Sequence, residues 1–120
     1  LLVLPDDAEP LGAAPTPDAA PIAFGLAHTD GNQHVNFLAY PRLVEEAALR
    51  RVSSLGFGSR RLARFAEIGY RKPFFAGDAA RILLQAFRHQ AGLGVIAAFV
   101  PEGSRELDRP HCAVRMLLDE

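Results

Sequence analysis

The chain has 120 residues and a mass of 13.0 kDa, which is enough for one domain with one hydrophobic core. Its composition, 49% hydrophobic and 22% charged, is that of an ordinary soluble globular protein. A formal net charge of -1 gives no electrostatic support for binding nucleic acid. No apolar run reaches membrane-spanning length, so no membrane partner is expected.

Two residue types that occur only once set further limits. Cys112 is the only cysteine, which excludes an internal disulfide, and its apolar neighbours predict a packed thiol. This usage fits a reducing compartment, and we expect a cytoplasmic location. Met116 is the only methionine, so we expect the protein to continue upstream of Leu1.

The first 21 residues are rich in proline and alanine. Proline removes an amide donor and fixes φ, so residues 1–21 are predicted to form an irregular arm, with a short strand over 1–4 as its only regular element. A single domain is predicted over 22–120. The prolines of the arm are Pro5, Pro10, Pro15, Pro17 and Pro21.

A strand and a helix are predicted next. Residues 22–27 favour a strand that ends in a turn-like cluster. From Asn36 to about Leu55 apolar residues recur every three or four positions, which predicts a helix. Asn36 is the expected N-cap, and two glycines after Leu55 end the helix. Pro41 predicts either a distorted first turn or a helix that begins at Pro41 itself.

The second half of the chain predicts four strands, separated by a turn at 75–78, a glycine-rich link and a polar loop over 101–110. One strand, one long helix and four further strands indicate an α+β fold, in which an antiparallel sheet uses the helix to cover one face. The crossovers of a doubly wound parallel sheet are absent. The four strands are predicted over 66–73, 81–89, 95–100 and 111–118.

The segment before the helix carries the groups that are suited to chemistry. Asp30, Asn32 and His34 place an acid, a carboxamide and an imidazole on alternate positions. The amides of Val35–Phe37 are expected to be unpaired at the helix N-terminus, where they would bind a developing oxyanion. Asp30 would act as base or nucleophile, Asn32 would orient water, and His34 would polarise a carbonyl or carry a proton.

This segment resembles the signature of hotdog-fold acyl thioesterases. The signature has an aspartate, a His-Val-Asn turn and a tyrosine, matched by Asp30, residues 34–36 and Tyr40, and then Glu-Glu-Ala on the central helix, matched by residues 45–47. Residues 30–36 are most similar to the acyl-carrier-protein thioesterases of plants and bacteria, whose motif reads Asp-x-Asn-Gln-His-Val-Asn. The resemblance implies a hotdog fold, an antiparallel sheet wrapped around one long helix.

The resemblance also implies a reaction and partners. It implies hydrolysis of an acyl thioester of coenzyme A or of acyl carrier protein, without a metal or other cofactor. Dimers join two sheets edge to edge, so a homodimer, or a pseudo-dimer with an upstream hotdog unit, is expected. By position the catalytic residues would be Asp30, Asn32, His34 and Glu46, and the substrate-binding residues Val35, Asn36, Phe37, Tyr40 and Arg71.

Departures from the family pattern leave alternatives open. Gln33 replaces the common glycine, Phe37 replaces a second asparagine, and no Cys or Glu follows in the next strand around 70–73. The chain could therefore be a silent hotdog that binds acyl groups or mediates dimerisation. A hotdog dehydratase or hydratase is the other alternative, although its Asp-x-Asn-Pro-x-His motif lacks its proline here and His34 comes one residue early.

Ordinary structural roles also remain open for these residues. Asp30 and Asn36 are suited to turns and caps. Glu45 and Glu46 would suit a solvated helix face, with Glu46 pairing with Arg50 four positions on. Arg71 belongs to a group of basic residues that would hold phosphates or simply form a polar surface.

Overall fold

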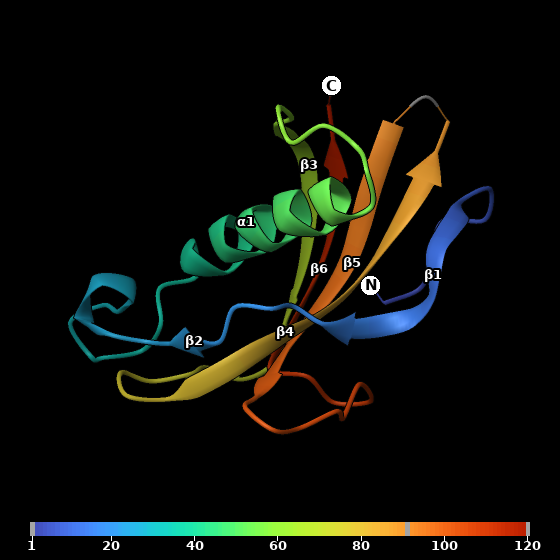
Figure 1. The fold of residues 1–120 in the computed structure, drawn as a ribbon. Helices are drawn as coiled ribbons and strands as arrows, with labels where there is room; N and C mark the ends of the chain where they lie inside the picture. Colours follow the sequence, from blue (N-terminus) through green and yellow to red (C-terminus); the bar gives the residue numbers. More distant parts are fainter. Residues whose placement is uncertain (1, 91, 120) are drawn as a thin grey trace.

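A computed structural model describes residues 2–90 and 92–119 and shows one long helix lying across a strongly curved antiparallel sheet (Figure 1). Within these residues the sheet runs in the order β1-β4-β5-β6-β3, and β2 also pairs with β4. The elements are β1 (Glu9–Pro17), β2 (Ile22–Ala23), the 3-10 helix η1 (Leu26–His28), α1 (Ala39–Ser54), β3 (Ala63–Tyr70), β4 (Ala79–His89), β5 (Gly92–Pro101) and β6 (Cys112–Leu118). The predicted α+β architecture is confirmed.

The buried stripe of α1 faces the sheet. Its members recur at three- and four-residue spacing, as the sequence pattern predicted, and two of them are alanines that let the helix approach the strands closely. Alternate residues of β4, β5 and β6 complete the same core. The helix contributes Tyr40, Val44, Ala47, Ala48 and Val52, and the strands contribute Ile82, Leu84, Val95, Ala97, Phe99, Val114 and Met116.

The two ends of α1 follow from local chemistry. Leu38 is the N-cap, and Asn36 accepts the amide protons of Leu38 and Ala39 through its side-chain and main-chain oxygens. The N-cap predicted at Asn36 is therefore two residues too early. Pro41 lies in the first turn, where an amide proton has no helical acceptor, and the helix begins at Ala39, before Pro41 and not at it. Gly56, with φ of 93°, ends the helix as predicted.

The arm predicted to be irregular contains a strand of the sheet. Residues 9–17 form β1, which pairs with β4 from Glu9 opposite Arg88 to Pro17 opposite Leu83. A register shift between Leu11 and Thr16 interrupts the pairing. Because β1 is an edge strand, its prolines are tolerated at positions where no amide proton is needed.

Two smaller predictions near the N-terminus are also wrong. Residues 2–4 form no strand, and Leu1 lies outside the described residues. The strand predicted over 22–27 is reduced to β2, because the chain turns into η1 at Leu26. The N-terminal segment lies against the outer face of the sheet, where Arg115 donates to the main-chain oxygen of Val3. No helix in the described part of the chain is long and apolar enough to cross a membrane.

Candidate functional site

Asp30 organises the turn that precedes α1. One carboxylate oxygen, Oδ1, accepts the amide protons of Asn32 at 2.9 Å and His34 at 3.1 Å. Gln33 closes the turn in the left-handed region with φ of 62°. The other oxygen, Oδ2, has no hydrogen-bond partner among the described residues, and the side chain is exposed. The carboxylate is thus fixed through one oxygen, while the other faces solvent.

The three amides predicted to form an oxyanion site are not equivalent. The amide of Val35 donates to the carbonyl of Phe74 at 2.8 Å, and that of Asn36 donates to the carbonyl of His28 at 2.6 Å. Both are used by the fold, so the prediction is wrong for these two donors. The amide of Phe37 has no acceptor in the described part of the chain. It is the one donor of the three that is left for a ligand.

Tyr40 supports the site from the core. Its side chain is 0% exposed, and its hydroxyl oxygen accepts the amide proton of Phe74 at 3.3 Å. Burial raises the pKa of Tyr40 to about 12. Val35 is buried as well, at 3% exposed. Both residues hold the loop around Phe74, and the predicted contact of Tyr40 with substrate stays a prediction.

Tyr70 is a residue of this site that the sequence interpretation missed. It ends β3 and is 45% exposed, with its ring centroid 5.9 Å from that of Phe37 and 5.8 Å from that of Tyr40. Partial burial raises the pKa of Tyr70, and the nearby Cys112 and the charge of Asp30 raise it further. The sequence offered one signal for Tyr70, which was its position. The family that residues 30–47 resemble places a Cys or Glu in the strand after the helix.

His34 and Asn32 contribute mainly through their backbones. Both side chains are exposed. The imidazole of His34 packs edge-on against Phe75, with ring centroids 4.9 Å apart, and the two residues form an isolated β-bridge. The side chain of Asn32 makes no hydrogen bond to another described residue. Their predicted catalytic roles stay predictions, with the geometry favouring a structural role for the His34 ring.

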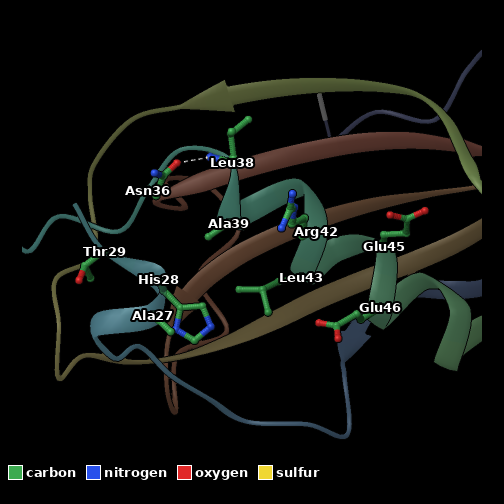
Figure 2. A pocket seen from close by; sticks show the side chains of 10 residues that line it. All are labelled: Ala27, His28, Thr29, Asn36, Leu38, Ala39, Arg42, Leu43, Glu45 and Glu46. Atoms are coloured by element: carbon green, nitrogen blue, oxygen red, sulfur yellow. Dashed lines mark hydrogen bonds between the residues drawn. The ribbon is translucent and has the colours of Figure 1, made fainter.

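A cavity of about 640 Å³ lies between η1 and the first turns of α1 (Figure 2). Asn36 and Leu38, the neighbours of Phe37, are part of its wall. A second cavity of about 250 Å³ shares His28, Leu43 and Glu46 with the first. The lining of the larger cavity is Ala27, His28, Thr29, Asn36, Leu38, Ala39, Arg42, Leu43, Glu45 and Glu46.

The polar groups of the cavity differ in how firmly they are held. Glu45 Oε2 accepts the amide proton of Ala63 at 2.9 Å, which ties it to the start of β3. Glu46 is exposed and reaches toward His28 across the cavity (Figure 2). His28 Nδ1 accepts the amide proton of Gly25 at 3.3 Å, which leaves Nε2 available. The sequence interpretation had assigned no role to His28, whose placement depends on the η1 turn.

Arg71 lies apart from both cavity linings. Its guanidinium donates to the carbonyls of Pro110 at 2.9 Å and Arg109 at 2.7 Å, so it fixes the loop between β5 and β6. Its side chain and that of Lys72 are exposed. Among the described residues, no three His, Cys, Asp or Glu side chains form a group that could hold a metal ion.

Solved structures of the same fold are similar to this chain at low sequence identity. Gentisyl-coenzyme A thioesterase BH1999 is 16% identical, with a TM-score of 0.67 over 82% of this chain and 85% of that one. Slr0204, a 1,4-dihydroxy-2-naphthoyl-CoA thioesterase from Synechocystis, is 19% identical, with a TM-score of 0.65 over 82% and 77%. The protein SAV2348 from Staphylococcus aureus, in complex with CoA, is 12% identical, with a TM-score of 0.71 over 89% and 71%.

By sequence, the chain matches no protein-family model and no curated protein. Structural similarity at 12–19% sequence identity establishes the fold but not the reaction. The shared architecture is an antiparallel sheet that wraps one long helix, as in Figure 1. The resemblance found in residues 30–47 and the three-dimensional likeness agree. The chain has the hotdog fold.

Proposed function

We propose that this protein hydrolyses acyl thioesters of coenzyme A or of acyl carrier protein. The observation that carries the proposal is the Asp30 carboxylate, which is fixed through one oxygen and open at the other, at the turn that leads to the open amide of Phe37. A base or nucleophile and an oxyanion donor are the two groups that acyl transfer requires. The activities named for two structures of the same fold support this reaction class.

The chemistry follows from these two groups. Asp30 takes a proton from water while the water oxygen attacks the thioester carbonyl, or it attacks the carbonyl itself and water releases the acyl group. The Phe37 amide donates to the oxygen as negative charge develops on it, aided by the positive end of α1. Collapse of the intermediate breaks the C–S bond, and the departing sulfur takes up a proton. The products are a free acid and a thiol.

The surroundings fit the two ends of such a substrate. The cavity between η1 and α1 begins beside Phe37 and would receive the acyl group, with Glu46 and His28 as its polar contacts. A site with charged walls favours an acyl group that carries polar substituents, because an alkyl chain would leave those charges desolvated and unpaired. Arg71 and Lys72 would meet the phosphates of coenzyme A or an acidic carrier protein.

The variant Asp30→Asn tests the assignment. The new carboxamide would still accept the two turn amides but would neither remove a proton nor attack a carbonyl, so the turnover number should fall by about 10²–10⁴-fold. The matched control is Asp78→Asn, since Asp78 accepts the amide proton of Phe75 at 2.8 Å in a similar turn. The control variant should keep parent activity and the same fold by circular dichroism.

The assay is thiol release from a panel of acyl-CoA and acyl-carrier-protein substrates, followed with a chromogenic disulfide reagent. Burial raises the pKa of Cys112 to about 12, so the protein thiol adds little background. Binding of acyl-CoA without thiol release would contradict hydrolysis and support the alternative, a silent acyl-binding module. Addition of water to an enoyl thioester, with the thiol retained, would identify a hydratase.

We also propose that the protein acts as a homodimer, or with an upstream hotdog unit, through the free edge of β3. We further propose a location in the cytoplasm, where a free thiol such as that of the buried Cys112 persists.

A further inference from the structure

Tyr70 packs against two aromatic rings of the site, those of Tyr40 and Phe37. The amide of Phe74 donates to the hydroxyl oxygen of the buried Tyr40 at 3.3 Å. The ring of Tyr70 lies edge-on to that of Tyr40, with centroids 5.8 Å apart. The Tyr40 hydroxyl lowers the pKa of Tyr70, and the Tyr70 hydroxyl raises that of Tyr40. The hydroxyl of Tyr70 makes no hydrogen bond to another described residue.

The same tyrosine lies beside Phe37 of the proposed site and feels the charge of Asp30. Its ring contacts that of Phe37, whose amide is the open oxyanion donor. It also lies close enough to Asp30 for the carboxylate charge to raise its pKa. Its backbone is held at the end of β3, where Tyr70 pairs with Cys112 of β6. A side chain on a paired strand keeps its direction better than one on a loop.

We propose that Tyr70 is a further catalytic residue, whose hydroxyl donates a hydrogen bond to the thioester oxygen beside the Phe37 amide. This assignment rests on the proposed hydrolysis and supplies it with a second oxyanion donor. Partial burial, Cys112 and Asp30 raise the pKa of Tyr70, so the donor stays protonated at neutral pH.

The first test is Tyr70→Phe, which keeps the aromatic ring and its packing against Phe37 and removes only the hydroxyl. Loss of one oxyanion donor should lower kcat by about 10²-fold and leave KM nearly unchanged, because the bond strengthens only in the transition state. The control on the same strand is Glu67→Gln, which faces the outer side of the sheet toward Arg115 and should keep the parent kcat.

The second test needs no activity. Tyr40 and Tyr70 are the only tyrosines, and the chain has no tryptophan, so ultraviolet absorbance can follow the titration of each phenol. Tyr70→Phe should leave a single transition, that of Tyr40, with a pKa that burial still raises but that lies below the parent value because the contribution of Tyr70 is lost. Asp30→Asn should lower the pKa of Tyr70, because it removes a nearby negative charge.

The outcomes separate this assignment from the proposed function. If Asp30→Asn abolishes thiol release while Tyr70→Phe keeps the parent kcat, the assignment of Tyr70 is overturned and the hydrolysis stands. An unchanged Tyr70 titration in Asp30→Asn would also overturn it, since the two groups would then be too far apart to share a substrate atom. Absence of thiol release from the parent protein would overturn the proposed function and this assignment with it.

Discussion

Some polar groups of residues 30–40 are used by the fold and others are open to a substrate. Partners that lie elsewhere in the chain decide which are which. The sequence correctly identifies Asp30 as the centre of a turn before a helix, because the capping pattern is local. It does not reveal that the amides of Val35 and Asn36 are used by carbonyls of Phe74 and His28, because those pairings depend on tertiary structure. The same loop around Phe74 explains why Tyr40 is buried.

Cys112 and Tyr40 make the fold sensitive to alkali. Burial raises the pKa of the Cys112 thiol from 9.0 to about 12, and it raises the pKa of Tyr40 from 10.0 to about 12. The folded state keeps both protons in this range, whereas the unfolded chain releases them. The free energy of unfolding should therefore fall as pH rises from about 9 toward 12, by at most roughly 1.4 kcal/mol per pH unit for each group.

Urea denaturation at several pH values between neutrality and about 10.5 measures this loss. The matched variant is Cys112→Ala, which removes the thiol and should show a shallower decline above pH 9, although its stability at neutral pH will be lower. Equal slopes for the variant and the parent would show that the thiol does not contribute.

At the level of elements, a segment was predicted correctly where its local sequence determines whether it forms a helix or a strand. The helix and the strands β4, β5 and β6 were predicted within a few residues, because their apolar runs are bounded by glycine, proline or polar turns. β1 was missed because its prolines argue against a strand. Pairing with β4 decides its conformation, and an edge position tolerates the missing amides.

Gly94 tests how tightly β5 is packed between its neighbours. A Cβ added there would collide with the ring of Phe87 and would lie 2.8 Å from the main-chain oxygen of Met116. Gly94→Ala should therefore lower the free energy of unfolding by about 1–3 kcal/mol, because the backbone oxygen cannot move aside. Gly92→Ala is the control, since its Cβ would be 3.4 Å from the oxygen of Leu118, an ordinary contact.

Chemical denaturation of both glycine variants gives the comparison. A loss for Gly94→Ala together with unchanged stability for Gly92→Ala would show that the close approach of Phe87 to the strand is real. Equal stability of the two variants would mean that the ring of Phe87 moves at little cost.

At the scale of the whole molecule, the two edges of the sheet differ. The β1 edge carries Pro10, Pro15 and Pro17 and a shift in register, which discourage pairing with another strand. The β3 edge has no proline over Ala63–Tyr70. Exposed apolar side chains lie along β3 or beside it, which favours this edge as the contact surface for a second copy. They are Leu62, Phe65, Tyr70, Phe37 and Leu38.

Phe65→Lys should weaken the proposed dimer. Phe65 lies on β3 and is 46% exposed in the single chain, so a charge there has little effect on the monomer but would be buried against a partner's sheet. The control is Val3→Lys, because Val3 is 73% exposed and its segment lies over Arg115 on the outer face of the sheet, not at the β3 edge. Light scattering after size exclusion should give a dimer for the parent and the control, and a monomer at the same concentration for Phe65→Lys.

A monomeric parent, or an unchanged dimer in Phe65→Lys, would contradict the assignment of β3 as the interface. Loss of thioesterase activity together with the dimer would further indicate that the site at Asp30 and Phe37 is completed by the second copy.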